Sequence, residues 1–180
     1  MNAQISNDID IQFLTEYLLW SDRKVVSLLK KLKEEEFNRS FGELTGSIHS
    51  KTAHILSIYE FFIKIIEGNP HDKFPDLSHL NQKELIAKWE TILEQWPGLV
   101  KGTEKSDLLG LPLAGNQRVE AQHIFLDALL HTVHHRGQIL TFIRLLGKTK
   151  EEVDPRDTNL DYLMYLFAEH KELIHPPDNK

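Results

Sequence analysis

The sequence contains no cysteine among its 180 residues. This absence excludes disulfide bonds, thiolate metal ligands and a cysteine nucleophile. Glycine and proline are also scarce, with 9 and 7 residues, and few breakers of this kind favour helices. The chain is therefore expected to fold without covalent cross-links and mainly as helices.

Positive charge is in the minority, with 21 lysine and arginine residues against 27 acidic ones and a formal net charge of -6. A nucleic-acid-binding protein needs a basic surface that neutralises several phosphates. We expect neither nucleic-acid binding nor a nucleic-acid partner.

Long hydrophobic runs are missing too. The most apolar stretch, residues 55–66, contains Glu60 and Lys64, and its dozen or so residues fall short of the roughly 20 that a spanning helix needs. The first residues, MNAQISNDIDIQF, have no features of a secretory signal. We therefore predict a buried helix rather than a membrane anchor, and a cytoplasmic protein.

What the sequence does contain is 41% hydrophobic and 27% charged residues, a composition typical of folded proteins. This length suits one domain with a core of its own, which we expect to span residues 1–180. Apolar residues recur at helical spacing in five segments. We predict helices at Asp8 to about Phe37, Ile48 to about Glu67, Asn81 to near Pro97, Arg118–Leu146, and a last segment capped by Thr158 and ended by Pro176 and Pro177.

Two irregular segments connect these predicted helices. Residues 70–80 read as a crossover from one end of a bundle to the other, and residues 98–116 read as a long loop that helps to shape a pocket. No strand is predicted. The expected fold is an all-α four-helix bundle with a long crossover connection and an additional C-terminal helical segment.

Two histidines, His131 and His135, lie four residues apart in the sequence DALLHTVHHRGQ. Successive helix residues rotate by about 100°, so positions four apart differ by about 40° and both imidazoles can reach one ion. His134 is a competitor at three residues from His131, but it stands about 100° from His135, and these two do not converge. The spacing predicts a chelating pair in which one of the adjacent histidines faces elsewhere.

A catalytic metal site usually has three protein ligands and an open position. His54 is the best candidate for the third, because it begins the most apolar part of the second predicted helix, where an imidazole without a partner is costly. Imidazole ligands favour zinc, nickel, iron or copper over calcium or magnesium. Simpler interpretations are a hydrogen-bonded core histidine for His54 and a chance spacing for the pair.

Three motifs carry a family resemblance. The sequence GSIHSKTAHIL at residues 46–56 places a histidine in the second helix, and HTVHHRGQ at residues 131–138 matches the signature HxxHHRGQ. The sequence DPRDTNLDYLMYL at residues 154–166 puts an aspartate before the last helix. Over nearly the whole chain, these motifs resemble the DinB family, also called DinB/YfiT-like metalloenzymes.

By this resemblance, the protein is a helical bundle, often homodimeric, that binds nickel or zinc through His54, His131 and His135. The resemblance also implies a small-molecule substrate. Characterised relatives include S-transferases and isomerases that use thiols such as bacillithiol, mycothiol or glutathione, so a low-molecular-weight thiol is the implied cosubstrate. Two positions depart from the family pattern, since Leu130 replaces a frequent asparagine and Asp127 a frequent histidine.

Several neighbouring residues have both a functional and a structural interpretation. Asp127 lies one turn before His131 and can accept the distal N–H of a ligating imidazole, or be an ordinary carboxylate. Glu120 and His123 have the Glu-x-x-His spacing of di-iron bundles, but those need the motif twice. His49 should point away from the metal, and Arg136 is either an anion-binding group or a solvated charge. Three tryptophans at core spacing are predicted to be structural, namely Trp20, Trp89 and Trp96.

Two classes of function remain. The first is a metal-dependent thiol S-transferase, or a hydrolase-like metalloenzyme, in which the ion activates a nucleophile and the loops select the electrophile. The second is a non-catalytic metal-binding bundle with a role in stress response or dimerisation. Structural zinc sites tend to close with four protein ligands, often cysteines, so three histidines favour the open, catalytic type.

Overall fold

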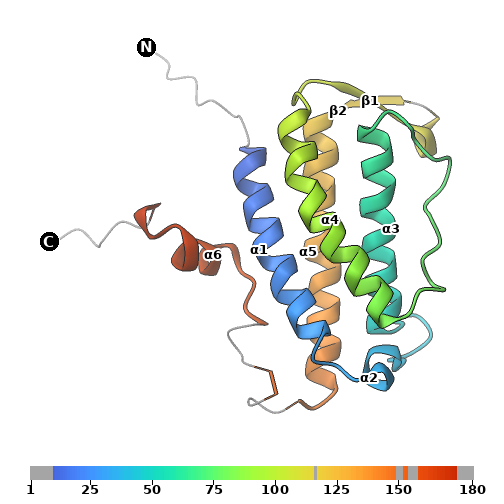
Figure 1. Ribbon diagram of the computed structural model, residues 1–180, viewed down its shortest axis with the longest axis vertical. Coiled ribbons are helices and arrows are strands. Elements are labelled where there is room, and N and C mark those ends of the chain that lie inside the picture. Colours follow the sequence, from blue (N-terminus) through green and yellow to red (C-terminus); the bar gives the residue numbers. More distant parts are fainter. Residues whose placement is uncertain (1–9, 116, 149–151, 154–157, 174–180) are drawn as a thin grey trace, which may run out of the picture.

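The computed structural model describes residues 10–115, 117–148, 152–153 and 158–173. Four long helices form the bundle, and each presents an apolar stripe to a shared core (Figure 1). They are α1 (Ile11–Leu29), α3 (Ile48–Ile66), α4 (Gln82–Gly102) and α5 (Ala121–Leu145). The predicted all-α fold class is confirmed.

The first predicted helix is two helices in the structure. α1 ends at Leu29, and a short helix α2 (Glu34–Asn38) follows a turn. The turn lets Phe37 pack edge-on against His49 at the start of α3, with 5.7 Å between the ring centroids, and bury its side chain completely. A straight continuation of α1 would carry this aromatic ring away from the bundle. The predicted start at Asp8 lies outside the described residues.

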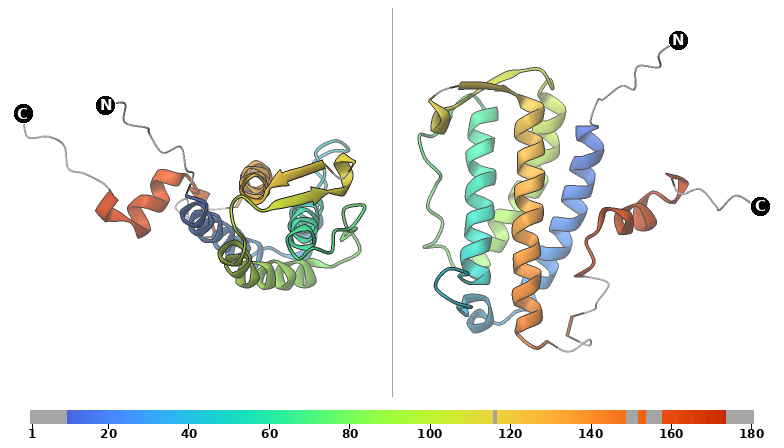
Figure 2. Two further views of the ribbon diagram at one scale, coloured as in Figure 1. Left: turned by 90° about the horizontal axis from the view of Figure 1, so that it is seen from above. Right: turned by 180° about the vertical axis from the view of Figure 1, so that it is seen from behind.

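The crossover is present as predicted. Residues 67–81 run along the length of the bundle, so that α3 and α4 point in the same direction (Figures 1 and 2). The side chains of Ser47 and Asn81 accept backbone N–H groups and cap α3 and α4. The sequence predicts a stop or a kink near Pro97, and the stop is wrong, because α4 continues to Gly102. Trp96 and Val100 are buried on either side of that exposed proline, and their packing holds the helix together.

The segment predicted to be irregular contains a small antiparallel hairpin of β1 (Leu108–Leu111) and β2 (Gln117–Glu120). Strand Leu108–Leu111 is paired with Glu120–Gln117, and a short 3-10 turn (Pro112–Ala114) lies between them. The hairpin covers one end of the bundle (Figure 1). Its second strand occupies the first positions of the predicted fourth helix, so α5 begins at Ala121.

The last helix, α6 (Tyr162–Glu169), lies beside α1 and projects from the bundle (Figure 2). It starts after Asp161 rather than at Thr158, and Lys171–Leu173 form a final 3-10 turn. The stop predicted at residues 176–177 lies outside the described part. Trp89 and Trp96 are buried in the core and Trp20 is half-buried. Within the described residues, no helix is long and apolar enough to cross a membrane.

Candidate metal centre

The three predicted histidines meet between α3 and α5. His54 comes from the second turn of α3, on the side that faces α5, and His131 and His135 come from successive turns of α5. One donor nitrogen from each residue lies within 4.8 Å of the other two. The helical period brings the i and i+4 side chains of α5 to one face, and the bundle places that face against α3.

The spacing of the nitrogens is compatible with a metal ion. Nε2 of His131 lies 3.1 Å from Nε2 of His54. Two nitrogens that are 3.1 Å apart and each bound at about 2.1 Å subtend an angle of about 95° at the ion, close to the value for neighbouring octahedral ligands. The donor nitrogen of His135 lies within 4.8 Å of both. The donor set therefore fits one ion of the borderline class.

Electrostatics keep the three imidazoles neutral. Partial desolvation of the rings where they crowd together lowers the pKa of His54, His131 and His135 below the ordinary value of 6.5, and the neighbouring histidines lower it further. The positive charge of Lys51 also lowers the pKa of His54 and His135. A neutral imidazole has a free lone pair, so the three donors are ready for a metal near pH 7.

Exposure differs across the three residues, since His135 is buried, His131 is half-buried and His54 is exposed. The expectation that His54 lies in an apolar interior is wrong. Its chain neighbours Ala53 and Ile55 are buried, whereas the helical rotation turns His54 outward. The cluster is consequently open to solvent on the α3 side, where a small molecule could approach.

A glutamine positions the buried histidine. Nδ1 of His135 donates to Oε1 of Gln138 at 2.7 Å, and Nε2 of Gln138 donates to Nε2 of His134 at 3.1 Å. The first bond holds the proton on Nδ1 and leaves Nε2 of His135 as the metal-binding atom. Sequence reasoning missed Gln138, although it closes the HxxHHRGQ motif. The structure brings His135 to the cluster and leaves His134 exposed beside it.

Asp127 does not have the predicted contact. It is exposed, and none of the hydrogen bonds between described residues joins it to His131; its negative charge only opposes the lowering of the His131 pKa. His49 faces the crossover, as expected, with Nε2 2.8 Å from the carbonyl oxygen of Leu80. A carboxylate oxygen of Glu120, the last residue of β2, lies 3.9 Å from Nε2 of His123 in the first turn of α5.

Arg136 is neither a surface charge nor an anion-binding group. Its guanidinium is 2% exposed and lies 2.5 Å from a carboxylate oxygen of Asp22 on α1. It also donates to the hydroxyl of Ser21. The second carboxylate oxygen of Asp22 accepts from the Tyr59 hydroxyl at 2.9 Å and from the indole N–H of Trp89 at 3.0 Å. The four long helices are thus joined through one buried carboxylate.

The sequence of α1 does indicate that a buried cation is needed beside Asp22. Asp22 lies in the apolar stripe of α1, one turn from both Leu18 and Val25, which are buried. A carboxylate there requires a buried partner of opposite charge. Arg136 in the HHRG sequence is that partner, but the spacing of residues along α5 does not indicate which helix its side chain faces.

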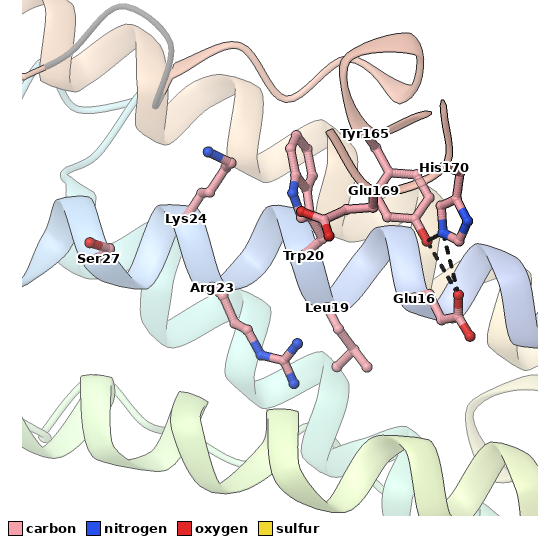
Figure 3. A pocket seen from close by; sticks show the side chains of 9 residues that line it. All are labelled: Glu16, Leu19, Trp20, Arg23, Lys24, Ser27, Tyr165, Glu169 and His170. Atoms are coloured by element: carbon pink, nitrogen blue, oxygen red, sulfur yellow. Dashed lines mark hydrogen bonds and ion pairs between the residues drawn. The ribbon is translucent and has the colours of Figure 1, made fainter. Parts of the chain in front are cut away.

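A separate hollow of about 560 Å³ lies between α1 and α6 (Figure 3). The hydroxyl of Tyr165 lies 2.7 Å from Nε2 of His170 and 3.3 Å from a carboxylate oxygen of Glu16. Burial, followed by the charge of Glu16, raises the pKa of Tyr165 to about 12. None of the three clustered histidines lines this hollow.

The match to a family model places this chain in a known class of helical bundles. The model of the DinB family matches residues 5–164, and the chain therefore belongs to that family. It is similar to the uncharacterized protein YjoA of Bacillus subtilis (strain 168), with 22% identity over 149 residues that cover 81% of this chain and 93% of YjoA.

The fold of a relative has been solved. The crystal structure of the DinB-like protein YjoA from Bacillus subtilis, at 2.30 Å resolution, gives a TM-score of 0.60 at 19% identity. The match covers 76% of this chain and 94% of that one. At this identity the likeness concerns the fold alone.

Proposed function

We propose that this protein binds one divalent metal ion per chain, nickel or zinc, through His54, His131 and His135. The observation that carries the proposal is the convergence of three neutral imidazole nitrogens within 4.8 Å of one another. Three protein donors leave positions for solvent or substrate, and the exposed side of the cluster gives access to them.

Of the two enzyme reactions we favour a thiol S-transferase over a hydrolase-like one, because the sequence resembles a family whose characterised members include thiol-dependent enzymes. A bound divalent ion supplies a positive charge that lowers the pKa of a low-molecular-weight thiol. In the overall reaction, the thiol sulfur forms a bond to a carbon of the electrophile and the carbon–leaving-group bond breaks. The leaving group departs with its electron pair, and the thiol proton passes to solvent or to that group.

The residues of the chain hold and orient the reactants. Gln138 fixes the tautomer of His135, and burial keeps its ring in place. The exposed edge at His54 admits the thiol and the electrophile. The hollow beside this cluster is lined by residues of the loop before α3, not by the segment 98–116 that we expected to shape it.

A non-catalytic metal-binding bundle, with a role in stress response or dimerisation, is the alternative. In that case the ion would stabilise the fold and would need no access for substrate. The exposed face of the cluster argues against a closed structural site. The two functions differ in whether the metal-loaded protein has activity towards small molecules.

The metal is tested first, on protein purified without a polyhistidine tag, by elemental analysis after equilibration with nickel or zinc. We expect one equivalent per chain, and a loss of affinity of roughly a hundredfold or more in His54→Ala, because one of three ligands is gone. His123→Ala is the matched control, since this exposed histidine of α5 lies outside the cluster. Equal binding by both variants would contradict the proposed ligand set.

The reaction is tested by incubating a generic electrophile with bacillithiol, mycothiol and glutathione in turn. We expect S-conjugation by the metal-loaded protein to exceed that of the chelated protein and of His54→Ala with at least one thiol. If S-conjugation by the metal-loaded protein never exceeds that of the chelated protein with any thiol, the transferase proposal is contradicted and the non-catalytic function is favoured.

We also propose that two copies associate through α6. Its outer face exposes apolar side chains that α1 does not cover. They are Leu163, Met164 and Phe167, whereas the partly exposed Tyr162 packs edge-on against Phe13 and Tyr17 of α1. Light scattering after size exclusion should give a dimer mass, and the double variant Leu163→Glu/Phe167→Glu should give a monomer; an unchanged mass would place the interface elsewhere.

A further inference from the structure

A hollow of about 320 Å³ adjoins the histidine cluster. It lies between the loop before α3, the first turns of α3 and the second half of α5. Two of its lining residues, His134 and Gln138, belong to the hydrogen-bonded chain that reaches His135. The hollow therefore lies next to the candidate metal centre, although none of the three clustered histidines lines it.

Lys51 lines this hollow one helical turn before His54. Its side chain is half-buried, and within the described residues no hydrogen bond or ion pair involves it. The other half-buried lysines of the described part each have a partner. Lys24 lies over the Trp20 ring, Lys64 pairs with Glu67, Lys88 with Glu60 and Lys148 with Glu36. Lys51 is thus the exception among them: its aliphatic stem is partly covered, and its ammonium group is free to bind an anion that enters the hollow.

The lining of the hollow offers hydrogen-bond donors and no carboxylate, although the chain has 27 acidic residues. His134 accepts from Gln138 through Nε2, so its own ring proton lies on Nδ1 and is available for donation. Nε2 of Gln138 has a second N–H besides the one given to His134. Leu44 and Phe142 add apolar surface. Such a lining suits a ligand that is anionic at one end and apolar in its body.

The charge expected at the candidate metal centre also favours a ligand with an anionic group. Three neutral imidazoles leave a divalent ion with its full charge, and the Lys51 ammonium adds a further positive charge on the same side of α3. Like charges that lie close together outside bulk water repel, and an anion between them relieves that repulsion.

We propose that Lys51 anchors a carboxylate of the substrate in this hollow while the other end of the same molecule reaches the three histidines. The inference rests on the proposed metal binding and specifies its substrate class, a small carboxylate-bearing thiol or thiol adduct. Lys51 is a specificity-determining residue in this scheme. It distinguishes ligands that carry an anionic group from neutral ligands with the same donor atom.

The test uses cobalt-loaded protein and two probes that share a thiol, β-mercaptopropionate and mercaptopropanol. Thiol binding is followed by the sulfur-to-cobalt charge-transfer absorption at low ionic strength. We expect β-mercaptopropionate to bind roughly fivefold to tenfold more tightly, which is the range for a charge-assisted contact that remains partly exposed. In Lys51→Met this preference should fall to about twofold or less.

Two further variants keep the result interpretable. Lys101→Met removes the same charge from the last turn of α4, at the hairpin end of the bundle, and should keep the preference (Figure 1). Lys51→Arg keeps the charge and should keep most of the preference, which guards against misfolding of Lys51→Met.

The outcomes separate the two proposals. Failure to bind cobalt at the histidines would overturn the proposed function. Cobalt binding with equal affinity for both probes would overturn the role of Lys51 alone, as would a preference that survives in Lys51→Met, since the carboxylate would then bind the ion itself.

Discussion

Helix α5 carries two polar clusters that start at adjacent residues and differ in kind. Arg136 enters a closed cluster with Asp22, Tyr59 and Trp89, in which the charge and the buried donors have partners within the protein. His135 enters an open cluster in which three imidazole nitrogens converge and one ring is exposed to solvent. The first cluster joins helices, whereas the second presents donors to something outside the chain.

The comparison shows how two adjacent residues of one helix can have different roles, one in stabilising the fold and one in binding. A rotation of about 100° between adjacent residues turns Arg136 towards α1 and His135 towards α3. The ion pair fixes the rotation of α5, and that rotation sets the direction of the histidines. The closed cluster should therefore govern stability, and the open one should govern metal affinity.

The largest expected effect comes from breaking the closed cluster. Asp22→Ala leaves the Arg136 guanidinium buried without a counter-charge, and we expect a loss of roughly 3–5 kcal/mol in the free energy of unfolding. Denaturant titration measures it. As a control, Glu90→Ala removes the exposed partner of Lys30 and should cost less than about 1 kcal/mol. Equal losses in the two variants would remove the distinction between the clusters.

A smaller effect is expected from replacing Gln138, the residue that positions His135 in the open cluster. Gln138→Leu removes the acceptor of the His135 Nδ1 proton, and we expect metal affinity to fall roughly tenfold to a hundredfold with little change in stability. Gln138→Glu keeps an acceptor and should keep the affinity. Competition with a chelator of known strength gives the values. If Gln138→Leu binds the metal as the wild type does, the glutamine has no positioning role.

The smallest effect concerns pH. Desolvation lowers the pKa of all three clustered histidines below 6.5, so above that pH their rings are mainly neutral and each has one nitrogen with a free lone pair. Metal affinity should therefore change less than about twofold between pH 8 and pH 7, and should fall steeply below pH 6.5 as protons compete. The same chelator competition, repeated at each pH, measures this. A decline that already begins near pH 8 would mean that the pKa values are raised rather than lowered.

The helical bundle could be predicted because most of its order lies in local periodicity. Apolar stripes and the caps Ser47 and Asn81 indicate where α3 and α4 begin, and the i, i+4 spacing places His131 and His135 on one face. The hairpin at residues 108–120 escaped prediction because its strands are only four residues long and contain no clear alternation.

Tertiary contacts account for the other differences. Pro97 looks like a helix end until the burial of Trp96 and Val100 is known. Arg136 reads as a surface charge until α1 brings Asp22 against it. Lys51 is an ordinary helix-surface lysine in the sequence, and only the folded chain reveals that it is half-buried with no side-chain partner among the described residues. Each of these properties depends on a second element that spacing along one helix does not specify.

The histidines of the candidate metal centre come from two helices, and His131 follows His54 by 77 positions along the chain. Once an ion joins them, α3 and α5 cannot separate without giving it up. Local openings of these two helices would then become rarer by the factor that the binding free energy sets. Amide hydrogens that exchange through such openings would do so more slowly when metal is present, and those of α6 would keep their rates. The ion would act as a removable cross-link in a chain that has no cysteine to make a permanent one.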